Sequence, residues 1–180
     1  MDLRSEILKE HSRKQSLKIA AWIGSSAGRF KELLKLFLHD EYRVSQRSAW
    51  VISFVAANYP ELIKENIHLL VKRLYDKELP VAVKRNVIRV LQFIKIPKSL
   101  HARVINLCIG YLLNPNETVA VKVFSMTVLA HLAIQYPDIR HEIELAIRSQ
   151  LKNSTAGFRS RASKVLKQLE KISSANSTIL

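Results

Sequence analysis

The chain has 180 residues, an apolar fraction of 48% and a single cysteine, which exclude a disordered segment and an internal disulfide. Its net charge is +14, from 29 Lys and Arg against 15 Asp and Glu. Four Gly and five Pro are few for an all-β fold with many tight turns, and they favour long helices.

The first predicted element is a capping unit over residues 3–24. The opening residues MDLRSEILKEHSRKQ carry charges throughout and lack the apolar centre of a signal peptide. LKIAAWIG at residues 17–24 takes the place of a second helix in this unit, and GSSAG at residues 24–28 is predicted to form a turn between helices.

Residues 27–170 follow as four predicted helix pairs with a period of 37–38 residues. VAVKRNVIRVL at residues 81–91 and VAVKVFSMTVL at residues 119–129 share their first four and last two residues. A period of this length is typical of helical repeat arrays. Basic residues recur at the matching place in each pair, at Arg47, Lys84, Lys122 and Arg159.

Apolar or small residues recur at spacings of three and four after each basic residue, which places them on one face of a helix. The predicted packing columns are Trp50, Val87, Ser125 and Ala162; Phe54, Leu91, Leu129 and Leu166; and Ala57, Ile94, Leu132 and Leu169. First helices such as residues 61–76 and 99–114 precede these second helices. The sequence therefore predicts an all-α fold of about nine to ten helices in a single domain over residues 1–180, with residues 173–180 as a flexible tail.

Each predicted turn opens with Asp or Asn and leads into a Val–Lys or Phe–Arg pair, as at Asp76 with Val83–Lys84 and at Asn153 with Phe158–Arg159. In these features the chain resembles the HEAT and HEAT-like repeat families. The resemblance implies a right-handed α-α superhelix, the HEAT-like solenoid, with second helices along its concave surface. It also implies a structural ladder of hydrogen bonds between repeats, made by Asp40, Asp76, Arg47, Lys84, Lys122 and Arg159.

Catalytic and metal signatures are absent from the sequence. Its six histidines show no HxxxH or HExxH spacing, and Cys108 lies in the apolar run VINLCIGYLL. Small HEAT-like proteins similar to this chain sometimes carry an adenylosuccinate lyase label, but GSSAG matches only the GSS opening of that superfamily's signature loop. We predict no catalytic residue, metal, cofactor or small-molecule substrate, and hence a non-enzymatic protein.

The chain also resembles, more distantly, the HEAT-like alkylpurine DNA glycosylases, which hold duplex DNA in a basic concave groove. Those enzymes use groove-facing Trp, Asp and Arg near the lesion. Only Trp22 and Trp50 are present here, and no Trp–Asp–Arg set accompanies them. Glycosylase activity is therefore not expected.

Positive charge gathers in the second half of the chain. Residues 81–180 hold 15 Lys and Arg against 5 Asp and Glu, and residues 79–116 and 145–169 contain no acid. This asymmetry favours a polyanionic partner, or serves only the solubility of a basic surface. The candidate partner or nucleic-acid surface consists of outward residues on second helices: Arg85, Arg89, Gln92, Arg161, Lys164 and Lys167.

The equivalent positions in the other two helix pairs are mainly apolar, at Ser48, Ile52, Val55 and Val123, Thr127, Ala130. A phosphate track would repeat its charges in every pair. The leading hypothesis is therefore a monomeric cytoplasmic scaffold that binds a protein or peptide on its concave face. The alternative is a nucleic-acid-binding solenoid, similar to DNA alkylation-repair proteins, that uses its basic C-terminal half. The longest uncharged stretch, residues 123–137, is too short to predict a membrane span.

Overall fold

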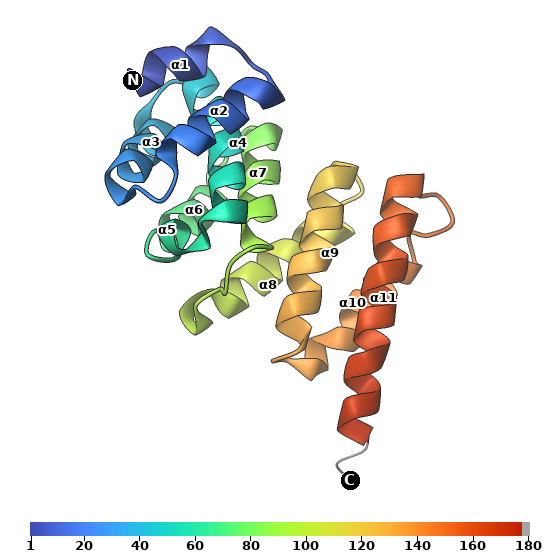
Figure 1. Ribbon diagram of the computed structural model, residues 1–180. Helices are drawn as coiled ribbons and strands as arrows, with labels where there is room; N and C mark the ends of the chain where they lie inside the picture. The colour runs from blue at the N-terminus through green and yellow to red at the C-terminus, as the bar shows by residue number, and fades with distance from the viewer. Residues whose placement is uncertain (178–180) are drawn as a thin grey trace. The chain divides into compact units, whose positions relative to one another are not determined.

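A computed structural model describes residues 1–177, with side chains described through residue 172. Within that range every regular element is a helix, which confirms the predicted all-α class (Figure 1). The elements are α1 (Leu3–Lys9), α2 (Arg13–Ile23), α3 (Ala27–His39), α4 (Tyr42–Asn58), α5 (Pro60–Lys64), α6 (Ile67–Arg73), α7 (Val81–Leu91), α8 (Lys98–Leu113), α9 (Val119–Ala133), the short 3₁₀ helix η1 (Pro137–Ile139), α10 (Arg140–Arg148) and α11 (Ala156–Ser177).

The helix count within residues 1–177 is eleven rather than nine or ten, because the first helix predicted at residues 61–76 is divided into α5 and α6. Asn66 lies at the break, and its side-chain amide donates to the Leu62 carbonyl at 3.4 Å. Asn competes for backbone hydrogen bonds in this way, which disfavours it inside a helix. The tail predicted at residues 173–180 overlaps the end of α11, which continues to Ser177; residues 178–180 lie outside the described residues.

The helices form two compact halves, Met1–Ile96 and Pro97–Leu180. The sequence predicts a single domain over residues 1–180, with no boundary between two halves. The N-terminal half (Met1–Ile96) holds α1 to α7, and the C-terminal half (Pro97–Leu180) holds α8 to α11. Each half contains two of the four predicted helix pairs, and the capping pair α1–α2 belongs to the first.

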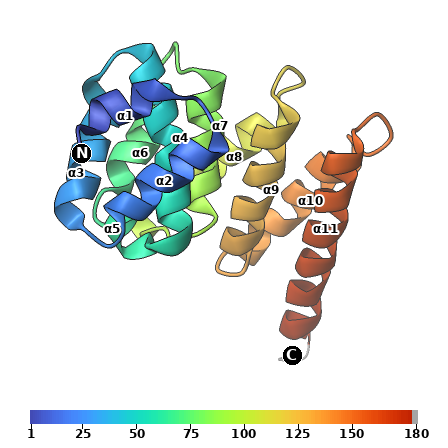
Figure 2. The same cartoon turned by 45° about the horizontal axis from the view of Figure 1, so that its top comes forward.

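In the N-terminal half, α4 is the central helix. It packs against α2 on one side and α7 on another, and also contacts α1 and α3 (Figure 2). Its partner α3 contributes Phe30, Leu33 and Phe37, whose spacing places them on one face, and all three are fully buried. Because α4 has neighbours on so many sides, ten of its residues are buried.

In the C-terminal half, α9 takes the corresponding central place and packs against α8 and α11 (Figure 1). Its sequence VAVKVFSMTVLAHLA is apolar on nearly all faces, as expected for a helix with packed neighbours around it. Opposite it, α8 buries Val104, Cys108 and Leu112, which lie four residues apart along one face. The two halves thus each have a core built around a second helix.

The first three residues of GSSAG form the predicted turn between α2 and α3, and its last two begin α3. Gly24 ends α2 with a φ of 51°, the one positive φ found in the described part of the chain. Ser26 begins α3 by accepting a hydrogen bond from the Arg29 amide. A left-handed residue favours glycine because it lacks a Cβ, so the turn itself explains this short motif.

Candidate binding surface

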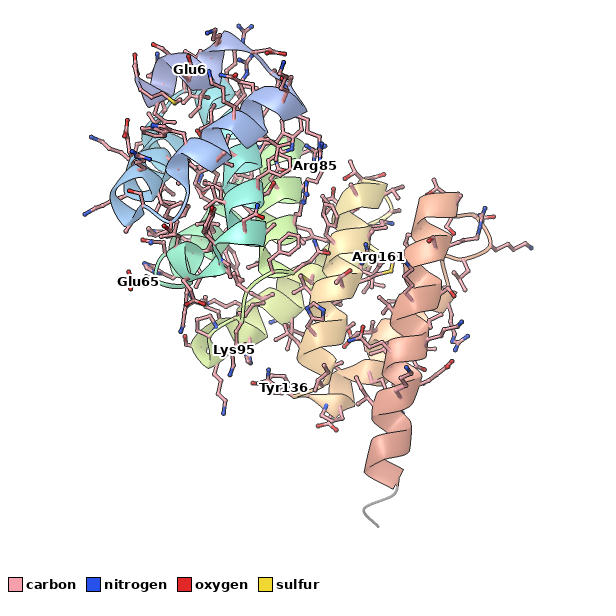
Figure 3. All side chains as sticks on the ribbon, in the orientation of Figure 1. Glu6, Glu65, Arg85, Lys95, Tyr136 and Arg161 are labelled. Carbon is pink, nitrogen blue, oxygen red and sulfur yellow. The ribbon has the colours of Figure 1, made fainter. Side chains whose placement is uncertain are left out.

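Three arginines of the N-terminal half lie close to one another, and we call them the arginine cluster: Arg13, Arg85 and Arg89. Arg13 is the first residue of α2, directly after Ser12, whose hydroxyl accepts from the Gln15 amide at 3.1 Å and fixes the start of the helix. Arg85 and Arg89 lie one turn apart on α7, where i and i+4 side chains are neighbours. Figure 3 labels Arg85 on α7, close to the start of α2.

Phe54 of α4 lies close to two of these arginines. The Arg89 Cζ is 5.3 Å from the Phe54 ring centroid, and the Arg13 Cζ is 6.0 Å from it. Both distances fall within the range of a cation–π attraction. The ring is 7% exposed, so α4 supplies a buried apolar base on which guanidinium groups from α2 and α7 are placed.

Two further rings extend this base. Trp50, one turn before Phe54 on α4, has its ring centroid 6.1 Å from the Phe54 centroid in a tilted arrangement. His11 meets Trp50 edge-on, with centroids 5.3 Å apart. The predicted packing column contains Trp50, yet its side chain is partly exposed, because it lies at the edge of the helix packing beside the exposed His11. The cluster is therefore flanked by an aromatic surface.

The arginine cluster is positively charged, and its other members lower the affinity of Arg89 for protons. Burial lowers the pKa of Arg89 from its ordinary value, and the neighbouring charges of Arg85 and Arg13 lower it further. In residues 1–172 none of the three makes an ion pair. The result is a concentrated positive charge whose mutual repulsion an anion would relieve.

Gln92, another residue of the predicted surface, lies directly after the last residue of α7. Its side-chain amide donates to the Arg89 carbonyl at 3.2 Å, and the residue is half-buried. The Arg89 carbonyl thus accepts from both the backbone amide and the side chain of Gln92 at the C-terminus of the helix.

In the C-terminal half, the three predicted surface residues lie on α11. Arg161, labelled in Figure 3, donates to the Thr127 hydroxyl of α9 at 3.1 Å and so links the two helices. Lys164 and Lys167 are exposed. These two lysines therefore offer charge to solvent, whereas Arg161 is partly used in helix packing.

The predicted apolar part of the surface is not present on α4. Ser48, Ile52 and Val55 are 0%, 1% and 0% exposed, because α4 is packed on several sides by other helices. On α9, Ala130 is also buried, while Val123 and Thr127 are half-buried. Of the third predicted column, Ala57 is exposed rather than packed, because it lies in the last turn of α4.

Among the predicted ladder residues, Arg47 bonds to the capping unit. Its Nη1 donates to the carbonyls of Ile7 and Leu8, at 3.0 and 2.8 Å, at the end of α1. A cation at this position also opposes the negative end of the helix dipole. Asp40 accepts two hydrogen bonds from Arg4, at 2.9 and 3.2 Å, and this pairing lowers the pKa of Asp40.

The other ladder residues differ in their contacts. Asp76 pairs with Arg73 of its own helix pair, and Arg159 donates to the nearby Ser154 carbonyl. Lys84 lies half-buried near the start of α7. Lys122, which is 8% exposed, donates from Nζ to the Gln150 Oε1 at 2.7 Å. The predicted ladder residues thus make contacts of different kinds. Gln150, which the repeat spacing does not single out, is the partner of Lys122.

The described side chains give little support for a reactive thiol or a metal site. Cys108 is fully buried, and burial raises the pKa of its thiol to about 12, which keeps it protonated and unreactive. In the part of the chain that the structure describes, no three His, Cys, Asp or Glu side chains are grouped to hold a metal ion. Nor does that part contain a helix with the length and apolar character that crossing a membrane requires.

The succession of helix pairs along the chain agrees with a family assignment. The sequence profile of the HEAT repeat domain matches residues 3–169. The chain belongs to the HEAT repeat family. No curated protein and no solved structure matches it. The HEAT match begins at the capping pair, so α1 and α2 belong to the repeat array, and HEAT repeats typically form non-enzymatic scaffolds.

The arginine cluster was only partly predictable. Arg85 and Arg89 follow from their outward positions on α7, but Arg13 lies in the capping unit, outside the 37–38-residue register. The sequence predicts Phe54 as a packing residue, which its burial confirms, but its role as a base for guanidinium groups depends on α2 lying beside α4. No sequence signal gave that placement.

Proposed function

We propose that this HEAT repeat chain is a non-enzymatic scaffold that binds an acidic segment of a protein or peptide on its second helices. The observation that carries the proposal is the arginine cluster of the N-terminal half, where three guanidinium groups lie together and make no ion pair within residues 1–172. Complementary charge gives such a surface both its choice of partner and a fast association rate. Lys164 and Lys167 on α11 give the C-terminal half a basic position of its own.

A protein partner is favoured over a nucleic acid by the spacing of the charges. The positions on α4 that correspond to Arg85 and Arg89 are Ser48 and Ile52, which are uncharged and buried. A nucleic-acid backbone presents phosphates at regular intervals, and a groove that follows it needs positive charge along its length. Charge concentrated at separate places suits acidic side chains in a folded or extended protein segment. A concave face across both halves stays a prediction from the family resemblance.

The proposal is tested by capture of partners with charge-reversal variants. The chain is immobilised and exposed to a lysate treated with nuclease, and bound proteins are identified. We expect a partner that is retained by the wild type and lost by the Arg85→Glu/Arg89→Glu variant. The matched control is Lys31→Glu/Lys35→Glu, which reverses two exposed charges at the same i, i+4 spacing on α3.

Equal loss of binding from the arginine variant and the α3 control would indicate diffuse attraction and contradict a defined surface. Loss of every bound protein after nuclease treatment would contradict a protein partner. Circular dichroism of each variant checks that the helices are unchanged.

Nucleic-acid binding is the second candidate, and the exposed Lys164 and Lys167 within the acid-free residues 145–169 favour it. Nucleic-acid binding of this kind weakens steeply as the salt concentration rises. A plot of log binding constant against log salt concentration has a slope of about −0.9 for each phosphate of duplex DNA that the protein contacts. Titration with a mixed DNA and RNA pool at about 50 mM salt measures the affinity, and repeating it at higher salt gives the slope. Binding that Lys164→Glu/Lys167→Glu abolishes would support this candidate, and no binding would remove it.

A further inference from the structure

The arginine cluster has the composition of a site for one compact, highly charged anion. Its members come from two helices, α2 and α7, that both pack on α4. Two of the guanidinium groups lie within 5.3 and 6.0 Å of the same ring centroid, and Arg85 is one turn from Arg89. Planar guanidinium groups bind oxyanions through pairs of parallel hydrogen bonds.

The aromatic base of the cluster is buried in the helix packing. Phe54 is 7% exposed and lies in α4, between the packed helices α2 and α7. The Arg13 side chain starts from a capped helix N-terminus, where the Ser12 hydroxyl accepts from the Gln15 amide. Side chains held on such a base lose less conformational entropy when a ligand binds, which raises affinity.

The amount of charge selects the anion. A single carboxylate or phosphodiester carries one negative charge, whereas a phosphorylated side chain carries about −1.5 to −2 at neutral pH and three acceptor oxygens. Three cations that repel one another match the larger charge better. The partial burial of Arg89, with its lowered pKa, shows that part of its desolvation cost is already met before a ligand arrives.

The aromatic flank suits the chain that bears the phosphate. Trp50 is partly exposed beside Phe54, and the exposed His11 meets its edge at 5.3 Å between centroids. This surface can hold the apolar part of a residue next to the phosphorylated one, since Trp supplies large contact area.

We propose that Arg13, Arg85 and Arg89 bind a phosphorylated serine, threonine or tyrosine in the partner segment. This inference rests on the proposed function, because the ligand is part of a protein or peptide. It adds that the interaction depends on phosphorylation and that the N-terminal half contains the phosphate site.

The test measures binding of fluorescein-labelled peptide mixtures of degenerate sequence by anisotropy. One mixture has phosphoserine at its centre, one phosphothreonine, one phosphotyrosine, and the matched mixtures lack the phosphate. We expect at least one phosphorylated mixture to bind about tenfold or more tightly than its match, since charge-assisted bidentate bonds are lost without the phosphate. Arg85→Gln and Arg89→Gln should each remove most of that difference.

Arg43→Gln is the matched control, because Arg43 is an exposed arginine of the same half, on α4. It should leave the preference for phosphorylated peptides unchanged. Arg89→Lys keeps the charge but not the planar donor pair, and we expect it to retain only part of the preference.

A second readout reports the site directly. In a Trp22→Phe background, Trp50 is the sole tryptophan of the chain, and its emission should change on titration with the phosphorylated mixture. An unchanged emission together with equal affinity for phosphorylated and unphosphorylated mixtures would overturn the proposal. So would tighter binding of a single-stranded oligonucleotide than of any phosphopeptide, with the same arginine dependence.

The two proposals fail in different ways. If the partner captured from lysate is retained after phosphatase treatment and is still lost with Arg85→Glu/Arg89→Glu, the phosphate site is wrong and the scaffold function stands. If no protein is retained under either condition and the peptide mixtures do not bind, both are wrong. Loss of the captured partner on phosphatase treatment supports both.

Discussion

Replacement of Gln150 by methionine is expected to destabilise the C-terminal half. Gln150 follows α10, and its side chain joins three elements. Its Oε1 accepts from Lys122 Nζ of α9 at 2.7 Å, and its Nε2 donates to the carbonyls of Leu112 at 3.0 Å and Ala146 at 2.8 Å. Methionine has a similar length but none of these groups, so Gln150→Met removes the hydrogen bonds with little change in volume.

The magnitude follows from what each partner loses. Lys122 is 8% exposed, and a hydrogen bond to a charged group contributes about 1.5–3 kcal/mol. The Leu112 carbonyl loses a neutral bond of about 0.5–1.5 kcal/mol. The Ala146 carbonyl keeps a donor, the Ser149 hydroxyl at 3.1 Å, and adds little. The free energy of unfolding should fall by about 2–4 kcal/mol.

Urea unfolding followed by circular dichroism measures this loss. Both tryptophans, Trp22 and Trp50, lie in the N-terminal half, so their fluorescence follows that half separately. A double-mutant cycle with Lys122→Met isolates the buried charge. Because the double variant leaves no unpaired ammonium group, it should cost less than the sum of the two single variants.

A cost below about 0.5 kcal/mol for Gln150→Met, or strict additivity in the cycle, would refute the reasoning. Either result would mean that Lys122 reaches water or another acceptor when Gln150 is removed.

Three further predictions concern the core, the thiol and an acidic side chain. Leu91 and Leu129 are 1% and 0% exposed, so Leu91→Ala and Leu129→Ala should each lower the free energy of unfolding in urea titrations by about 2–5 kcal/mol. The control Lys164→Ala should lower it by less than about 0.5 kcal/mol. The reverse order of these costs would disprove the repeat register. Cys108, with its pKa raised to about 12 by burial, should react with a thiol reagent at pH 8 only when the chain unfolds, so rapid labelling of the native protein would contradict this. Hydrogen bonds from Lys18, the larger cause, and from Gln15 lower the pKa of Glu6 from 4.5 to about 2. The ionised Glu6 side chain therefore stabilises the fold above about pH 4.5, and this contribution is lost as the pH falls toward 2. Glu6→Gln should flatten that part of the acid-unfolding profile measured by circular dichroism, and an unaltered profile would exclude the pairing.

The repeat register predicted the helix pairs because repeated contacts leave repeated residues. Leu91 and Leu129 lie at matching places in α7 and α9 and meet matching neighbours, so both are buried. Ile52 shows where this logic ends. Its position in the register is that of Arg89, yet it is buried, because α4 also packs against the capping pair. Burial depends on the number of neighbouring helices, which a single repeat does not encode.

The arginine cluster could be predicted only in part, for a related reason. Arg85 and Arg89 could be placed on the outside of α7, but their meaning depends on Arg13, which comes from a segment outside the register. The pairing of Lys122 with Gln150 likewise joins α9 to the residue that follows the next first helix. Contacts between irregular positions arise from packing geometry, and one sequence contains no record of them.

The capping pair α1–α2 also determines which surface of α4 another copy of the chain could reach. A repeat array with an uncovered end presents apolar columns on which a second copy could stack, and continued stacking would produce fibres. Here α1 and α2 cover α4, and α2 turns the charged side chains of Lys14 and Lys18 to solvent. Arg47 fastens the pair through the carbonyls of Ile7 and Leu8. The surface of α4 beneath these two short helices is therefore not available for stacking against a second copy of the chain.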